Sequence, residues 1–109
     1  MENEAAVFKV LADPTRLRLM VLLSTQGETC VCKLAQALDA PDFKISRHLG
    51  IMRSAGLVKA RREGTWMHYK LSNARNRLEE CLQQCFRECL ATHTTVKADL
   101  KRLSKANCK

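Results

Sequence analysis

The segment from residue 38 to residue 57, LDAPDFKISRHLGIMRSAGL, constrains the fold of this chain more than any other stretch. On a helix with 100° between successive residues, Ile45, Leu49 and Met52 lie on one face, which predicts a buried side. Arg47 points the opposite way, toward solvent. Because a turn containing Asp and Pro precedes this helix, the pattern predicts a helix-turn-helix unit.

The segments on either side of this unit extend the pattern. A short helix is expected over residues 30–38, directly before the turn. Gly56 closes the later helix, and residues 57–62 and 65–71 then alternate between apolar and polar side chains. Such alternation on both sides of a Glu-Gly turn predicts a β-hairpin. The sequence therefore predicts a mainly α fold with one β-hairpin (α+β), a winged helix-turn-helix.

The rest of the chain has the pattern of helices. Residues 3–11 carry apolar side chains at helical spacing, and the Asp-Pro pair at 13–14 is typical of a helix start, in a segment that ends at Gly27. Residues 73–103 return to helical periodicity, with a break expected near residues 92–95, where three threonines lower helix propensity. No repeat or linker divides the 109 residues, so we expect one winged helix-turn-helix domain with a C-terminal dimerisation helix and tail.

Charge and composition favour a soluble protein that binds nucleic acid. Nineteen Lys and Arg against eleven Asp and Glu give a net charge of +8, which points to a polyanion. No stretch approaches the roughly 20 apolar residues that a membrane helix needs, and the N-terminus lacks a basic leader. We therefore expect a cytoplasmic protein with no membrane partner. In a reducing compartment its six cysteines favour thiolate or metal chemistry over disulfides.

The exposed face of the second helix of the helix-turn-helix predicts contacts to DNA bases. Arg47 can bind guanine O6 and N7 in bidentate fashion, while Lys44 and Ser46 can reach bases or phosphates. His48 is expected to turn partly toward the preceding helix. The alternative for all four is an ordinary polar surface.

The predicted hairpin carries a second group of basic side chains. Arg61 and Arg62, with Lys59 on the same strand and His68 and Lys70 on the return strand, suit phosphate or minor-groove contact. Solvated surface charge is again the alternative.

Cys30 and Cys32 stand one residue apart at the start of a predicted helix. In an ideal helix their side chains lie about 200° apart, so both sulfurs can bind one ion only if the first turn unwinds or shifts. A helix N-terminus lowers a thiol pKa, which favours the thiolate that soft metals and metalloids need. The alternative is that both are small structural residues.

The other cysteines allow two interpretations. Cys81, Cys85 and Cys89 recur every four residues, which fits either a dimer-interface core or a separate thiolate site. Cys108 lies in a tail that can fold back as a third ligand or can stay free.

A homodimer is expected through the terminal helices. Their apolar stripes exceed what one winged-helix core can cover: Val7, Val10, Leu11, Leu78, Leu82, Phe86 and Cys89. Such a two-fold dimer is expected to bind double-stranded operator DNA whose sequence is an inverted repeat.

Five local strings together resemble the arsenic-responsive repressor family (ArsR/SmtB): LADPTRLRLM, TCVCKLAQAL, KISRHL, AGLV and EGTWMHYKL. The resemblance covers roughly Val7 to Ser72 and is closest to the arsenite- and antimonite-responsive branch. It implies a homodimeric repressor that needs no cofactor to bind DNA. Release would follow binding of arsenite, antimonite or a soft divalent metal (Cd, Pb, Zn) to Cys30 and Cys32.

This chain departs from the resembled branch at two places. Ala35 stands where that branch often has a third cysteine, so a third ligand would come from elsewhere, with Cys81, Cys85, Cys89 and Cys108 as the candidates. The acidic Asp42 lies just before KISRHL, where the family tends to have small polar residues, which leaves the operator sequence open.

Two other functions compete with this interpretation. One is a winged-helix repressor switched by oxidation of its cysteines to a disulfide. The other is a thiol oxidoreductase, which C-x-C spacing and the absence of a thioredoxin-like strand and helix pattern make the weaker alternative. We therefore expect no enzymatic activity.

Overall fold

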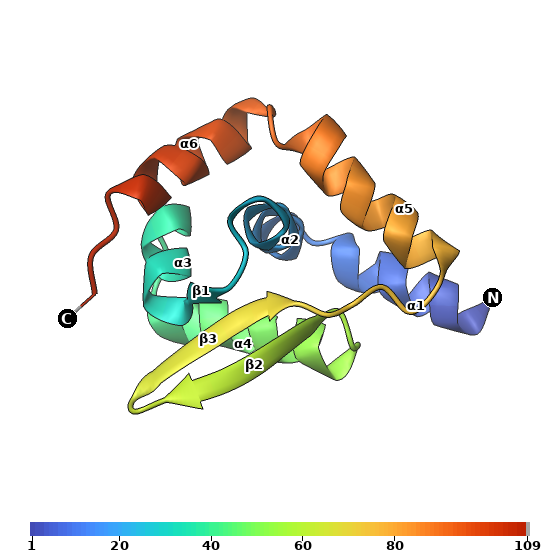
Figure 1. Ribbon diagram of the computed structural model, residues 1–109, viewed down its shortest axis with the longest axis horizontal. Helices are drawn as coiled ribbons and strands as arrows, with labels where there is room; N and C mark the ends of the chain where they lie inside the picture. The colour runs from blue at the N-terminus through green and yellow to red at the C-terminus, as the bar shows by residue number, and fades with distance from the viewer. Residues whose placement is uncertain (109) are drawn as a thin grey trace.

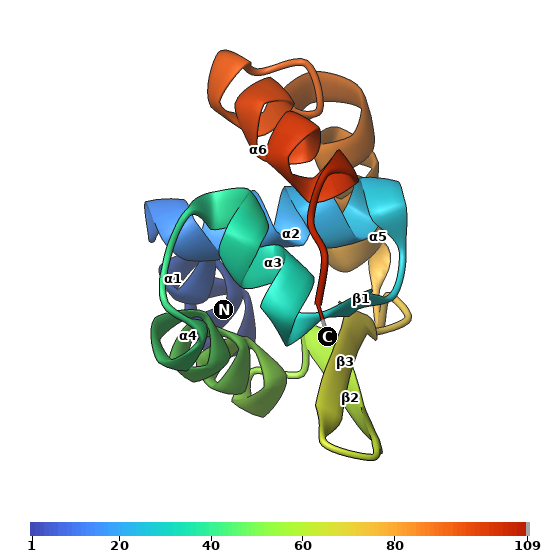
Figure 2. The same ribbon diagram turned by 90° about the vertical axis from the view of Figure 1, so that its left-hand side faces the viewer.

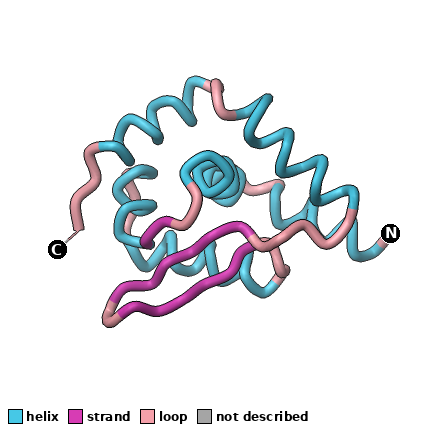
Figure 3. Tube along the Cα trace, in the orientation of Figure 1, coloured by secondary structure: helices cyan, strands magenta, loops and turns pink. Residues whose placement is uncertain are grey.

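A computed structural model describes residues 1–108 as helices around a small sheet (Figures 1 and 3). The elements are α1 (Glu2–Leu11), α2 (Pro14–Gln26), β1 (Thr29–Cys30), α3 (Val31–Leu38), α4 (Asp42–Ser54), β2 (Val58–Glu63), β3 (Trp66–Leu71), α5 (Arg77–Cys85), a π-helical turn η1 (Phe86–Leu90) and α6 (Thr94–Ser104). The expected winged helix-turn-helix is confirmed. No helix within residues 1–108 is both long enough and apolar enough to span a bilayer.

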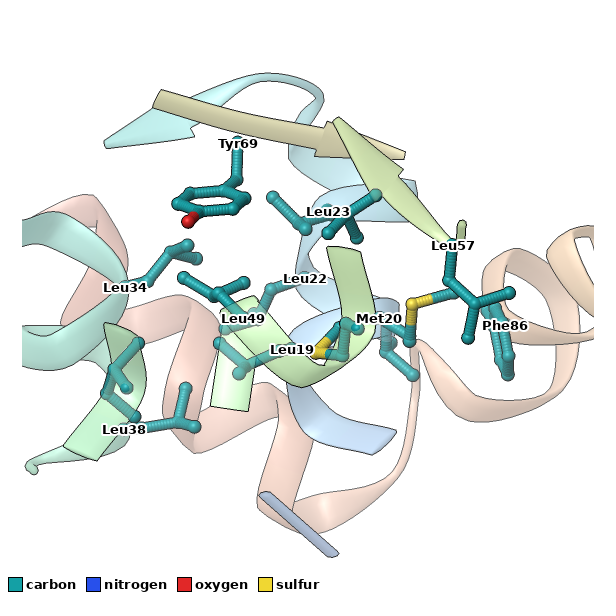
Figure 4. Close-up of a cluster of buried hydrophobic side chains, with 14 of the residues drawn as sticks. Leu19, Met20, Leu22, Leu23, Leu34, Leu38, Leu49, Leu57, Tyr69 and Phe86 are labelled. Atoms are coloured by element: carbon teal, nitrogen blue, oxygen red, sulfur yellow. The ribbon is translucent and has the colours of Figure 1, made fainter. Parts of the chain in front are cut away.

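Helix α2 forms the centre of the molecule (Figure 1). Asp13 caps it by accepting a hydrogen bond from the backbone N–H of Arg16. The sequence predicts a one-sided stripe of Leu17, Met20 and Val21, with Leu23 at its margin. Instead all five residues 19–23 are buried and Leu17 is only half-buried. Neighbouring elements surround this helix, so it buries apolar side chains in several directions (Figure 4).

Helices α3 and α4 form the helix-turn-helix. Asp39 ends α3 with a left-handed φ of 52°, a conformation that Asp tolerates better than most residues. Pro41 precedes α4, whose predicted buried face is confirmed, since Ile45, Leu49 and Met52 are fully buried.

Strands β2 and β3 form the wing and pair from Val58 opposite Leu71 to Glu63 opposite Trp66. Strand β1 adds a third strand, in the order β1-β3-β2, that the sequence did not predict. Its two residues are too few to show an alternating pattern. This short strand joins the segment before α3 directly to the wing.

The C-terminal helices have the predicted break. Helix α5 begins at Arg77, later than the expected residue 73, because Asn76 caps it by accepting from the N–H of Glu79. Residues 91–93 separate η1 from α6. Figures 1 and 2 show α6 beside α3.

A buried carboxylate fixes α6 in place. Asp99, fully buried, accepts hydrogen bonds from Arg18 Nε at 2.9 Å and Arg102 Nη2 at 2.7 Å. The Asp99 carboxylate in turn raises the pKa of Arg18. Since Arg102 also donates to the carbonyl of Ala37 at 2.7 Å, this cluster ties α6 to both α2 and α3.

The terminal helices leave less surplus apolar surface than their sequences suggest. Val7, Leu11 and Phe86 are buried within the chain itself. Phe8 is 51% exposed, and Leu82 is partly buried against the core. A dimer through these helices stays a prediction that rests on a smaller surface.

Candidate functional site

The N-terminal half of α4 presents polar side chains to solvent. Lys44, Ser46 and Arg47 are all exposed, on the side of the helix opposite its buried face. Phe43, next to them, is 73% exposed. Asp42 occupies the first turn, where a carboxylate interacts favourably with the helix dipole. An exposed polar face on the second helix of a helix-turn-helix is the feature that such proteins use to enter the major groove.

His48 lies on the other side of α4. It is buried, and its Nδ1 lies 3.2 Å from Arg16 Nη1 of α2. Arg16 also donates from Nε to the carbonyl of Val10 at 2.7 Å, so the three helices α1, α2 and α4 meet here. Burial lowers the pKa of His48. His48 is therefore a packing contact in this structure, and a base contact by it stays a prediction.

The two wing arginines differ in their surroundings. Arg61 forms ion pairs with Glu28 at 2.7 Å and Glu63 at 3.4 Å. Its hydrogen bond lowers the pKa of Glu28. Arg62 is exposed and forms no ion pair within residues 1–108. Lys59 and Lys70 of the same hairpin are also exposed. Glu28 precedes β1, so the Arg61 pair links strand β2 of the wing to the segment that leads into α3.

Cys30 lies outside the helix that the sequence predicted for it. It is the N-cap of α3, with extended φ and ψ of −71° and 143°, and the last residue of β1. Its backbone pairs with His68 of the wing, which explains the extended conformation. The sulfur is buried, and the 200° separation calculated for a continuous helix does not apply.

Cys32 lies in the first turn of α3 and is half-exposed. A disulfide joins it to Cys108, across 76 positions of sequence. The sequence favoured thiolate or metal chemistry over disulfides, and this pair departs from that expectation. Nothing in the sequence indicates where the tail lies, so this pairing was not predictable from composition.

A cavity of about 510 Å³ lies beside Cys30, between the wing and α6. His68 and Lys33 line it together with Glu28 and Leu103. The buried Nε2 of His68 has no hydrogen-bond partner within the described chain, and Glu63 Oε1 is too distant for one at 3.6 Å. The start of α3 therefore has space around it for rearrangement.

The other cysteines form a separate group on the outer helix, the continuous segment 77–90 made of α5 and η1. Cys81 and Cys89 are exposed and Cys85 is half-buried. Burial, together with the adjacent Cys89 thiol, raises the pKa of Cys85. That shift disfavours the thiolate form that binds metals.

No metal site is preassembled in residues 1–108, because no three His, Cys, Asp or Glu side chains lie close enough to hold one ion. Cys30 and Cys32 lie near each other in sequence but differ in burial and backbone conformation. A site that uses both requires a shift at the start of α3.

Sequence reasoning missed three residues of this region. Glu28 pairs with the wing, Gln36 hydrogen-bonds to the tail, and Asp99 anchors α6. Each makes its contact to a segment far away in the sequence, and no local pattern signals such a contact.

The comparisons with known proteins point to one family. Residues 13–60 match the family described as bacterial regulatory protein, arsR family. The chain is 54% identical over 66 residues to the arsenical resistance operon repressor of Escherichia coli K12, covering 61% of this chain and 56% of that protein. The chain thus spans about half the length of that relative.

Two solved structures support the same assignment. One is the homodimeric winged helix-turn-helix DNA-binding domain of a possible ArsR-family regulator from Mycobacterium bovis, with 36% identity, a TM-score of 0.66, and coverage of 85% of this chain and 86% of that one. The other is the cadmium metal-sensor CMTR from Mycobacterium tuberculosis, with 35% identity, a TM-score of 0.57, and coverage of 73% and 80%. The fold, the helix-turn-helix sequence and these likenesses together show that the chain belongs to the ArsR family of bacterial regulatory proteins.

Proposed function

We propose that this protein is a dimeric transcriptional repressor that releases operator DNA when arsenite, antimonite or a soft divalent metal binds the thiolates of Cys30 and Cys32. Family membership supports the regulatory role. The names of two relatives, an arsenical resistance operon repressor and a cadmium metal-sensor, support an inducer of this chemical class. Its place of action is the cytoplasm, and it is not an enzyme.

The DNA-binding surface combines α4 and the wing. Arg47 reads guanine in the major groove, while Lys44 and Ser46 contact bases or phosphates beside it. Arg61 and Arg62 bind phosphates from the wing. His48 acts mainly by holding α4 against α2. Each protomer binds one arm of an inverted repeat.

The observation that carries this proposal is that Cys30 belongs both to the cysteine pair and to a strand of the wing sheet. Cys30 ends a strand that pairs with His68 of β3, and Glu28, just before that strand, pairs with Arg61 of β2. Drawing the Cys30 sulfur toward Cys32 therefore displaces a strand of the wing sheet. The same movement shifts the start of α3, which supports α4.

The start of α3 also suits thiolates chemically. Cys32 lies in the first helical turn, where unpaired backbone N–H groups and the helix dipole favour negative charge. Soft thiolate ligands select soft metals and metalloids.

Titration of the reduced protein on operator DNA with arsenite, with cadmium and with peroxide tests the proposal. Release by arsenite or cadmium, and not by peroxide, is the expected result. No release by any metal or metalloid would contradict it.

The Cys32–Cys108 disulfide favours a second candidate, a repressor switched by thiol oxidation. In that case peroxide oxidises the two thiols to the disulfide and is itself reduced to water. Release by peroxide alone in the same titration would identify this function.

A further inference from the structure

The C-terminal tail lies against the start of α3. Figures 1 and 2 show the chain after α6 running beside α3. Cys32 and Cys108 are joined there, with their Cα atoms 6.1 Å apart. The tail thus brings a sulfur from the far end of the chain to Cys32, one of the two cysteines of the pair.

Hydrogen bonds hold the tail in this place independently of the sulfurs. Gln36 donates from Nε2 to the carbonyl of Asn107 at 3.0 Å, and the N–H of Asn107 donates to Gln36 Oε1 at 3.1 Å. The Arg102 contact to Ala37 anchors the end of α6 on the same helix. Cys108 therefore remains near Cys32 after reduction of the disulfide.

Gln36 also serves both sulfurs. Its Nε2 lies 3.2 Å from the sulfur of Cys32 and 3.5 Å from that of Cys108. An N–H donor directed at two sulfurs stabilises negative charge on them. The environment of the pair therefore suits thiolates as well as a disulfide.

We propose, as an extension of the function proposed above, that Cys108 of the same chain supplies the third sulfur to trivalent arsenic or antimony bound by Cys30 and Cys32. Arsenite, As(OH)₃, exchanges three hydroxyls for three thiols. Each thiol proton leaves with one hydroxyl as water, three As–S bonds form, and arsenic keeps its oxidation state.

The structure favours Cys108 over the other candidates for this role. Cys81, Cys85 and Cys89 lie on α5 and η1, on the opposite side of α2 from α3 (Figures 1 and 2). Ala35, one turn after Cys32, is buried in the core and offers no sulfur. Of the four candidates, Cys108 is bonded to Cys32, whereas Cys81, Cys85 and Cys89 are free thiols in the described structure.

X-ray absorption at the arsenic edge tests the proposal by counting sulfur neighbours. The full chain is reduced with a phosphine, which adds no thiol of its own, and loaded with one arsenite per protomer. We expect three sulfurs in the unmodified protein, and two sulfurs with one oxygen in Cys108→Ser. Arsenite affinity in Cys108→Ser should fall by about tenfold or more, since one intramolecular bond is lost. Cys89→Ser is the matched control and should keep three sulfurs.

The outcomes separate this inference from the proposed function. Three sulfurs in Cys108→Ser would overturn the inference while the function stands. An unchanged sulfur count in both Cys30→Ser and Cys32→Ser would show that arsenic binds elsewhere and would overturn both. Mixed dimers of one Cys32→Ser chain with one Cys108→Ser chain test which protomer supplies the third sulfur. If Cys108 comes from the same chain as Cys32, no site in this dimer has three sulfurs, as we expect. One three-sulfur site per dimer would assign Cys108 to the partner and contradict the proposal.

Discussion

The chain carries two groups of cysteines that differ in what surrounds them. Cys30 and Cys32 lie where α3 meets the wing sheet, and the tail brings Cys108 to the same place. Cys85 and Cys89 lie with Cys81 on the outer helix, where η1 packs on α2. The outer group has the more regular spacing, yet the first group has the direct structural connection to the DNA-reading elements.

Under the function proposed above, regular spacing along a helix does not identify the sensor. A ligand changes DNA affinity only if the liganded and free states differ at the DNA-binding surface. In the function proposed above, the strand pairing of Cys30 with His68 supplies this difference. The outer helix has no strand pairing of this kind within residues 1–108.

Removal of a sulfur from the first group should have the largest effect. Cys30→Ser or Cys32→Ser should bind operator as the unmodified protein does but fail to release it with arsenite. A hundredfold loss of induced release corresponds to about 2.7 kcal/mol of coupling. Fluorescence anisotropy of labelled operator during arsenite titration measures it. Cys85→Ser is the control, and equal release by all these variants would contradict the assignment.

Loss of the α6 anchor should have the next largest effect. Asp99→Asn removes the buried carboxylate that binds Arg18 and Arg102, so the free energy of unfolding should fall by about 2 to 3 kcal/mol. Urea denaturation measures this change. Arsenite affinity should also fall, because α6 positions the tail. A stability within about 0.5 kcal/mol of the unmodified protein would show that the cluster is not an anchor.

Arg47→Ala should weaken specific operator binding by about 1 to 3 kcal/mol, because it removes a base contact. Stability and arsenite binding should stay unchanged, since the side chain is exposed. Competition between operator and unrelated DNA measures the effect. An unchanged ratio of specific to nonspecific affinity would remove Arg47 from base recognition.

Replacement of either wing arginine should have a smaller effect on DNA affinity, and the two variants can be compared with each other. Arg62→Ala should weaken binding to all sequences and reduce the salt slope by about one unit. Arg61→Ala should change the slope less, because Glu28 and Glu63 already neutralise Arg61 in the free protein. Affinities at several salt concentrations give both slopes. A larger change for Arg61→Ala would show that DNA displaces its ion pairs.

The smallest expected effect is a pH dependence of the free energy of unfolding that arises from His48 on α4. Burial lowers the pKa of His48 in the folded state, so the unfolded chain binds the proton more tightly. Stability should therefore fall as the pH drops below about 6.5, the usual histidine pKa, until the folded-state pKa is passed. Urea denaturation between pH 5 and 8 measures it. His48→Gln should flatten the curve over this range, and an unchanged curve would contradict the account.

Local signals made most of the fold predictable. The Asp-Pro helix start, the buried face of α4 and the alternation of the hairpin each follow from residues close together in sequence. The sulfur pair Cys30 and Cys32 was found in the same way. These features need no knowledge of the tertiary structure.

Long-range contacts explain what the sequence did not predict. The two-residue strand β1 exists only because β3 pairs with it, and Cys30 leaves the helix for that reason. The disulfide from Cys32 to Cys108 depends on how α6 docks, which the buried Asp99 determines. Leu19 and Leu22 are buried because other elements surround α2.

In the proposed function, sulfurs at the start of α3, and not those of the outer helix, convert inducer binding into DNA release. The most direct test replaces all three outer cysteines together, as Cys81→Ser, Cys85→Ser and Cys89→Ser in one chain, and measures arsenite-induced release from labelled operator. We expect release at the same arsenite concentration as for the unmodified protein. A triple variant that binds operator normally but stays bound at saturating arsenite would contradict it.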